Sequence, residues 1–288
     1  MARLTYARLQ AGLIGCLGLG LAASAFAEPL QRVITLGGSV TEIAVALGAE
    51  ARLVARDTTS NYPDSILALP DVGYIRALSP EGVLAQDPGL VVAEGDAGPP
   101  EAVEVLKAAG VPFALVPEAT TPEGVTAKIT AVAAALDLAP EGEKLAAQVE
   151  ADLAKARTRA EAVTGKKRVL FILSLQGGRI MAGGEGTEAE GIIALSGGAN
   201  AATGFSGYKQ MTDEAVIAAA PDVVLMMDRE GDLAVADADL WAHPALALTS
   251  AGRSQKVIRM DGMLLLGFGP RTPQAAAALY DALYPAAG

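Results

Sequence analysis

A tyrosine and an arginine stand two positions apart in the segment "VGYIRALSPEGVL", residues 72–84, of a chain with only 4% aromatic residues. The phenolate of Tyr74 would be a hard anionic oxygen ligand of the kind that suits ferric iron. Because a free phenol ionises only near pH 10, such a ligand needs a cation beside it. Arg76 would supply that cation if the segment is extended, since side chains two apart then share a face. It would equally suit a carboxylate of a ligand, and an ordinary surface loop is the alternative.

The first 27 residues predict export. A basic start with Arg3 and Arg8 precedes an apolar run over residues 11–23, and Ala25-Phe26-Ala27 offers a cleavage site. The run is shorter than the roughly 20 apolar residues that span a bilayer. Lipid attachment at Cys16 is a less favoured alternative, because little apolar sequence precedes it. We therefore expect residues 1–27 to be a cleaved signal peptide and the mature protein to be periplasmic.

The composition of the remainder is acidic. Of 22 basic residues, removal of Arg3 and Arg8 leaves 20 against 33 acidic ones, a net charge of −13. This charge disfavours nucleic acid and anionic membrane as partners. The only cysteine, Cys16, leaves with the signal, so no disulfide is expected.

Strand and helix patterns alternate along the mature chain, which predicts parallel sheets covered on both faces. "RVITLGGSVTEIAVALGA" (32–49) indicates a strand, a Gly-Gly turn and a helix, and further strands are expected at 52–57, 89–95, 111–119 and 167–175. Residues 140–163 are rich in Ala, Glu, Lys and Leu, which predicts one helix of about 22 residues, about 33 Å long. The expected organisation is an N-terminal α/β lobe at 28–139, a linking helix at 140–164 and a C-terminal α/β lobe at 165–288.

An internal repeat supports two similar lobes. "SPEGVLAQDPGLVV" (79–92) aligns with "TDEAVIAAAPDVVL" (212–225), so that Ser79 matches Thr212 and Glu81 matches Glu214. Each segment predicts a helix cap, a short helix, a proline stop and a buried strand. Two Rossmann-like lobes joined by one long helix would leave a ligand cleft between them, at the carboxyl ends of their strands.

The sequence gives little indication of a phosphate-binding site or of a catalytic site. The turn Gly37-Gly38-Ser39 could hold an anion at a helix start, although a tight packing turn explains it as well. The sequence contains no GxGxxG or P-loop motif and no GxSxG elbow, and its single histidine, His243, is interpreted as structural. The glycine-rich stretch 181–192 is expected to be a loop in which Thr187 caps a helix. An enzyme is therefore not expected.

The chain resembles the periplasmic haem-binding proteins of bacterial haem ABC importers, which belong to the helix-linked substrate-binding proteins. The similarity covers essentially the whole mature chain and is carried by "LGGSVTEI" (36–43), "VGYIRALSPEGVL" (72–84), "MAGGEGT" (181–187), "GGANAATGFSGYKQMTDEAV" (197–216) and "LLGFGPRTPQAA" (265–276). The resemblance implies that Tyr74 is the axial ligand of ferric haem and that Arg76 supports its phenolate. It also implies that Arg229, in "MMDREG", faces the iron or the propionates from the second lobe.

The same resemblance gives the paired glutamates a role. In this class, Glu81 and Glu214 would dock onto arginines of the permease dimer, which works with its ATPase subunits. Favourable interaction with the helix macrodipole is the simpler alternative for each one separately. A long linking helix further predicts modest lobe movement on binding. Some relatives use a second-lobe histidine to take two stacked haems, but no histidine lies near 181–187 here.

The expected function is therefore haem binding and delivery by a monomer. A siderophore or corrinoid binder of the same fold is the first alternative, and an exported α/β enzyme is the second.

Overall fold

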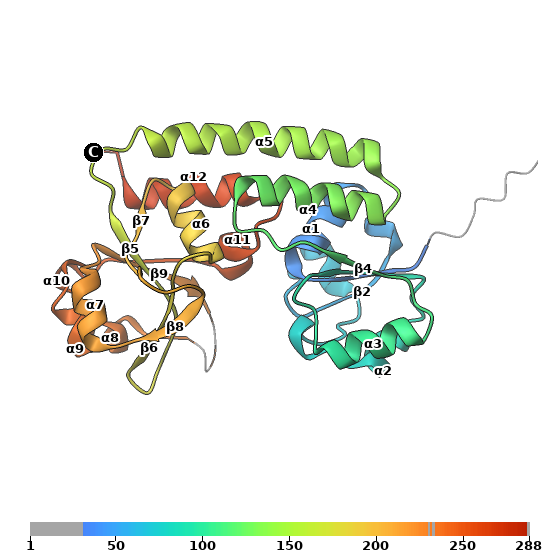
Figure 1. The fold of residues 1–288 in the computed structure, drawn as a ribbon, viewed down its shortest axis with the longest axis horizontal. Coiled ribbons are helices and arrows are strands. Elements are labelled where there is room, and N and C mark those ends of the chain that lie inside the picture. The colour runs from blue at the N-terminus through green and yellow to red at the C-terminus, as the bar shows by residue number, and fades with distance from the viewer. Residues whose placement is uncertain (1–30, 230, 232–233, 287–288) are drawn as a thin grey trace, which may run out of the picture. The chain divides into compact units, whose positions relative to one another are not determined.

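The computed structural model describes residues 31–229, 231 and 234–286, so the predicted signal peptide lies outside the described residues. Residues Gln31–Gly288 form one compact unit. Within it, two β-sheets are each covered by helices, and one long helix runs past both (Figure 1).

The first sheet is parallel throughout and has the order β2-β1-β3-β4. Its strands are β1 (Val33–Leu36), β2 (Leu53–Arg56), β3 (Leu90–Glu94) and β4 (Phe113–Val116). Its helices are α1 (Gly38–Ala46), α2 (Pro80–Leu84), α3 (Pro100–Ala108) and α4 (Pro122–Ala135), with 3-10 turns η1 (Glu50–Arg52), η2 (Asp64–Ala68) and η3 (Ile75–Ala77). Strand β3 is apolar on both faces because both are covered: Leu90 and Val92 pack with α1 and α4, whereas Val91 packs with α2 and α3.

The second sheet mixes parallel and antiparallel pairing. Its order is β10-β9-β5-β6-β8, with β7 paired to β5. The strands are β5 (Arg168–Gln176), β6 (Arg179–Gly183), β7 (Ala199–Asn200), β8 (Tyr208–Met211), β9 (Val223–Asp228) and β10 (Val257–Asp261). Its helices are α6 (Glu188–Leu195), α7 (Asp213–Ala219), α8 (Asp237–Trp241), α9 (Pro244–Ala247), α10 (Ser250–Ser254), α11 (Gly262–Leu266) and α12 (Thr272–Leu283).

The antiparallel part starts at a tight hairpin that the sequence analysis did not anticipate. Gly177 and Gly178 join β5 to β6, and both have positive φ, at 56° and 73°. Two-residue hairpin turns need positive φ at their central positions, which glycine adopts without strain. The parallel half formed by β10, β9 and β5 nevertheless repeats the plan of the first sheet.

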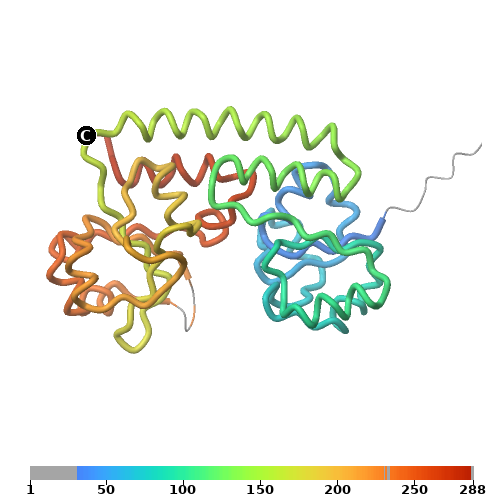
Figure 2. The backbone as a smooth tube through the Cα atoms, in the orientation of Figure 1, coloured from blue at the N-terminus to red at the C-terminus, as the bar shows by residue number. Residues whose placement is uncertain are grey.

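The linking helix α5 spans Ala139–Glu161, so it begins one residue and ends three residues before the predicted limits 140–164. Its 23 residues extend about 34 Å. It packs along α4 and α12, as Figures 1 and 2 show. Gly142 allows this close approach, because a Cβ at that position would lie 2.3 Å from the Cβ of Ala133 in α4.

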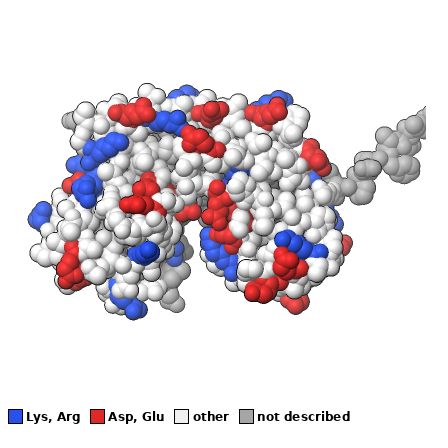
Figure 3. Space-filling view, in the orientation of Figure 1, with Lys and Arg blue, Asp and Glu red and all other residues white. Residues whose placement is uncertain are grey.

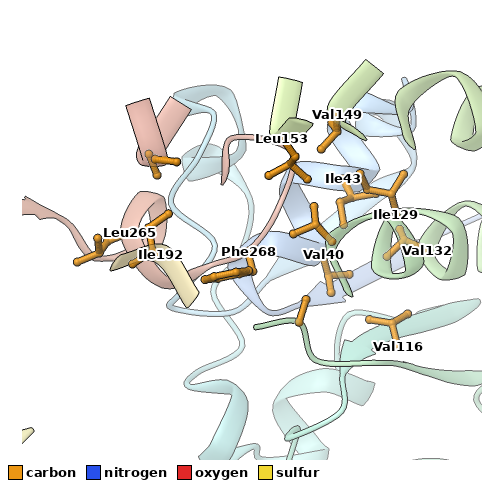
Figure 4. Close-up of a cluster of buried hydrophobic side chains, with 14 of the residues drawn as sticks. Val40, Ile43, Val116, Ile129, Val132, Val149, Leu153, Ile192, Leu265 and Phe268 are labelled. Carbon is orange, nitrogen blue, oxygen red and sulfur yellow. The ribbon is translucent and has the colours of Figure 1, made fainter. Parts of the chain in front are cut away.

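One apolar core continues from the first sheet to the second. It contains Val40 and Ile129 of the first lobe, Leu153 of α5, and Ile192 and Phe268 of the second lobe (Figure 4). The two lobes are therefore held together by buried side chains as well as by α5. Among the helices of the described ranges, none combines the length and apolar character needed to cross a bilayer.

Candidate functional site

A cavity of about 990 Å³ lies between the two sheets and is lined by residues of both. Glu94 ends β3 on one side, and Asp228 and Asp261 end β9 and β10 on the other. The cavity thus lies at the carboxyl ends of parallel strands, where open α/β sheets bind ligands. Its volume is at the upper end of the usual range for small-molecule sites. In Figure 3, acidic side chains lie on both walls of the gap between the lobes.

Tyr74 and Arg76 line this cavity and contact each other. Nη1 of Arg76 donates a hydrogen bond to Oη of Tyr74 at 2.6 Å. The phenol is 42% exposed although it is a large aromatic group, so its ring is open to a ligand. The contact arises differently from the expected extended segment: Tyr74 is extended, but residues Ile75–Ala77 form the 3-10 turn η3, which brings the guanidinium back to the phenol.

A positive charge beside the phenol oxygen stabilises the anionic form of the phenol. For Arg76 itself, burial works to lower the pKa, but the hydrogen bond to Tyr74 and the charge of Asp96 outweigh it, and the pKa of Arg76 is raised. The guanidinium is therefore charged at neutral pH. The pair presents the phenol oxygen of Tyr74, with a cation beside it, to the cavity.

A second phenol lines the same cavity in the opposite environment. Oη of Tyr208 donates to Oε2 of Glu188 at 2.9 Å. Burial, then the charge and the hydrogen-bond acceptor of Glu188, raise the pKa of Tyr208 far above its ordinary value. Tyr208 is consequently a neutral donor at physiological pH, and of these two cavity phenols only Tyr74 has a cation on its oxygen.

Arg229 follows β9 directly and lines the cavity from the second lobe, as expected from the sequence. Its Nη2 lies 3.8 Å from Sδ of Met227. The other two lining cations, Arg76 and Lys128, are paired with Asp96 and Glu94, respectively. Among the described residues, no carboxylate forms an ion pair with Arg229.

Lys128 and Asp96 belong to this site as well, although neither was expected from the sequence. Nζ of Lys128 is buried and contacts Glu94, Ser39 Oγ at 3.0 Å and the carbonyl of Gly267 at 3.2 Å. A signal was present, since Lys128 falls at a core-facing position of a helix whose apolar residues recur every three or four places. Asp96 could have been found as a carboxylate just beyond the carboxyl end of a parallel strand.

The Gly-Gly-Ser turn does not offer its N–H groups to a ligand. The N–H of Gly37 donates to Oδ1 of Asp57 at 3.0 Å, and that of Gly38 donates to Oγ1 of Thr59 at 3.0 Å. The chain's own side chains therefore accept the hydrogen bonds of these N–H groups, and the geometry supports a tight packing turn.

His243 is buried, and its Nε2 lies 3.0 Å from the carbonyl oxygen of Gly178, which fits the expected structural role.

The paired glutamates occupy equivalent places on the two lobes. Ser79 and Thr212 cap α2 and α7 as expected, and Glu81 and Glu214 lie exposed in the first turns. Thr187 likewise caps α6. For both glutamates, a hydrogen bond from their own backbone N–H and then one from the capping hydroxyl lower the pKa. Both therefore carry full negative charge at neutral pH.

This arrangement of two α/β lobes, one long linking helix and a cavity between them defines a helix-linked substrate-binding protein. The chain belongs to the periplasmic binding protein family, whose model matches residues 33–264. The family and the similar solved structures are binding proteins rather than enzymes, and so is this chain.

Among solved structures, the chain is similar to the periplasmic heme-binding protein BhuT in complex with two hemes, with 42% identity, a TM-score of 0.83, and coverage of 88% of this chain and 97% of BhuT. It is also similar to the heme-binding protein RhuT from Roseiflexus sp. RS-1, with 40% identity, a TM-score of 0.84, and coverage of 88% and 100%. Among curated proteins, it is 30% identical to a vitamin B12-binding protein of Vibrio parahaemolyticus, over 75% of this chain and 76% of that protein.

Proposed function

We propose that this protein binds ferric haem in the cavity between its lobes, with the phenolate of Tyr74 as an axial ligand to the iron. The observation that carries the proposal is the 2.6 Å hydrogen bond from Arg76 to the phenol oxygen of an exposed tyrosine in the cavity. Ferric iron favours a hard anionic oxygen ligand, and the neighbouring guanidinium stabilises that anion. The similarity to the heme-binding proteins BhuT and RhuT supports haem as the ligand.

The rest of the cavity suits a flat ligand with one acidic edge. Leu173, Met227 and Met263 contribute apolar surface to the lining. Arg229 would pair with a propionate or face the iron from the second lobe. Because Arg76 is already engaged by Asp96 and Tyr74, the carboxylate edge of the porphyrin is directed toward Arg229.

Delivery forms the second part of the proposal. The loaded protein would dock onto the permease dimer of an ABC importer in the periplasm through Glu81 on one lobe and Glu214 on the other. The equivalence of the two capped helices supports this role, because helix stability alone requires no correspondence between lobes. The permease would then separate the lobes and release the haem.

A visible spectrum tests the binding part. Hemin added to the purified mature protein should give the spectrum of high-spin ferric haem ligated by tyrosinate, with its charge-transfer band. Tyr74→Phe should lose this band and bind hemin more weakly. Tyr208→Phe is the matched control, since it removes the other phenol of the cavity, and it should keep the band.

Binding measurements also distinguish haem from the alternative ligands, cobalamin and ferric siderophores. If wild-type protein binds cobalamin or a ferric siderophore more tightly than hemin, the haem assignment is wrong. The vitamin B12-binding relatives make cobalamin the first competitor to titrate. An unchanged band in Tyr74→Phe would show that hemin binds elsewhere.

A further inference from the structure

The guanidinium of Arg76 is held from two sides. Its Nη1 faces the phenol oxygen of Tyr74, and its Nη2 forms an ion pair with Oδ2 of Asp96. A single planar group therefore connects a carboxylate to the phenol that opens into the cavity. Each contact uses a different nitrogen, so the two partners do not compete for one donor.

Backbone hydrogen bonds hold together the two segments that carry Asp96 and Arg76. Asp96 lies in the loop after β3, and Arg76 lies in η3. The N–H of Gly98 donates to the carbonyl of Ile75 at 2.9 Å, and the N–H of Leu78 donates to the carbonyl of Gly98 at 2.8 Å. These bonds bind the loop to the 3-10 turn, so that the carboxylate faces the guanidinium before any ligand arrives.

Apart from its contact with Arg76, the carboxylate of Asp96 lies in surroundings that lower the stability of the fold. Its second oxygen, Oδ1, is buried without a hydrogen-bond partner among the described residues. Its charge also repels a neighbouring carboxylate: burial and then Asp96 are the leading causes that raise the pKa of Glu118. A buried unpaired acceptor and like-charge repulsion both lower stability. A carboxylate at this position is therefore better explained by its contact with Arg76 than by the stability of the fold.

We propose that Asp96 is a positioning residue for the iron ligand: it holds the Arg76 guanidinium so that Nη1 remains on the phenol oxygen of Tyr74. Without it, an arginine side chain that is 56% exposed would turn into solvent, and the phenolate would lose its partner. This proposal rests on the proposed function, because it assigns Asp96 to the ligation of haem by Tyr74.

The test compares Asp96→Ala and Asp96→Asn with Arg76→Ala. Asparagine keeps an acceptor for Nη2 but removes the negative charge, whereas alanine removes both. In the hemin-loaded proteins, the tyrosinate band is followed on acidification. Its loss should occur at least about one pH unit higher in Asp96→Ala and in Arg76→Ala than in the wild type, and no higher in Asp96→Asn. Asp64→Ala, an exposed substitution on the same lobe and outside the cavity lining, should leave the midpoint unchanged.

A second measurement needs no haem. The side-chain ¹⁵N signals of Arg76 in the apo protein should show a slowly rotating guanidinium in the wild type and in Asp96→Asn, and a freely rotating one in Asp96→Ala. If Asp96→Ala keeps both the wild-type midpoint and the slow rotation, Asp96 does not position Arg76. If wild-type protein gives no Tyr74-dependent band, the proposed function fails, whereas the apo comparison still decides whether Asp96 holds Arg76.

Discussion

Arg271 at the start of α12 forms a two-point ion pair with Glu42 in α1, on the other lobe. Nε of Arg271 donates to Oε2 of Glu42 at 3.0 Å, and Nη2 contacts Oε1. The guanidinium also stacks on the ring of Tyr62, with 3.6 Å between Cζ and the ring centroid. Glu42 is 7% exposed, so this pair joins the last helix to the first inside the protein.

We predict that Arg271→Ala lowers the free energy of unfolding by about 3–5 kcal/mol, because it leaves a buried carboxylate without its cation. Denaturant unfolding at pH 7 measures the loss. Arg157→Ala breaks an exposed ion pair with Glu123 and should cost less than about 1 kcal/mol.

The pH dependence of this stability loss tests whether the unpaired carboxylate of Glu42 causes it. Burial raises the pKa of Glu42 even though Arg271 opposes the shift, so removal of Arg271 should raise it further. A raised pKa in the folded state penalises the ionised form, and that penalty disappears as the pH falls through the folded-state pKa. The difference between wild type and Arg271→Ala should therefore narrow on acidification, and the double variant Glu42→Gln/Arg271→Ala should lose less than Arg271→Ala. A difference that does not change with pH would contradict this explanation.

Local signals in the sequence predicted most of the elements that form the site. The strand–turn–helix at 32–49, the long helix and the caps Ser79 and Thr212 each follow from residues within a few positions of one another. The pairing of Tyr74 with Arg76 also lies within three residues. Such features depend on backbone propensity and on hydrogen bonds between residues close in the sequence. Both can be predicted from one sequence.

Contacts between distant segments were not predictable in the same way. Asp96 of the site reaches Arg76 through a loop that follows another strand, and Glu42 and Arg271, outside the cavity lining, are 229 residues apart. Only tertiary packing specifies these partners. The N–H groups of the Gly37-Gly38-Ser39 turn look available in the sequence, but the side chains of Asp57 and Thr59, in the loop after β2, accept the hydrogen bonds of the Gly37 and Gly38 N–H groups.

Glu118 provides a second prediction on pH. Burial, followed by the charges of Asp96, Glu188 and Glu94, raises its pKa, so its ionised form destabilises the folded protein above that pKa. Glu118→Gln should increase the melting temperature at pH 7. The increase should shrink as the pH falls through the raised pKa of Glu118 and vanish below its ordinary pKa, where the side chain is protonated in both the folded and the unfolded state.

Glu123 provides a control, because its substitution should change the melting temperature in the opposite direction. A hydrogen bond from its own backbone N–H is the main reason that its pKa is lowered. It therefore contributes stability above its ordinary pKa that is lost as the pH falls through the lowered value. Glu123→Gln should reduce the melting temperature at pH 7, and shifts of the same sign in both variants would contradict the electrostatic assignment.

The continuous apolar core predicts small lobe movement on ligand binding. Besides α5, the core side chains shared by both lobes and the Glu42–Arg271 pair would have to separate for a large closure. The only cysteine of the chain lies in the predicted signal peptide, so spin labels at Glu101→Cys in α3 and Ser254→Cys in α10 would be specific. Their distance distribution should shift by no more than a few ångströms when hemin is added. A change of the size typical of flexible two-strand hinges would count against a stiff connection.

Charge reversal at the two capped helices tests docking. Glu81→Lys/Glu214→Lys should abolish haem transport by the reconstituted importer while leaving the hemin spectrum and affinity unchanged, because both side chains are exposed and neither lines the cavity. Each wild-type carboxylate stays ionised through mildly acidic pH, since backbone and cap hydrogen bonds lower its pKa. Attraction between exposed charges is screened by salt, so wild-type transport should weaken as ionic strength rises. Glu143→Lys/Glu150→Lys makes the same change in net charge on exposed positions of α5 and should transport normally. If the two double variants transport haem equally well, these glutamates serve their helices alone.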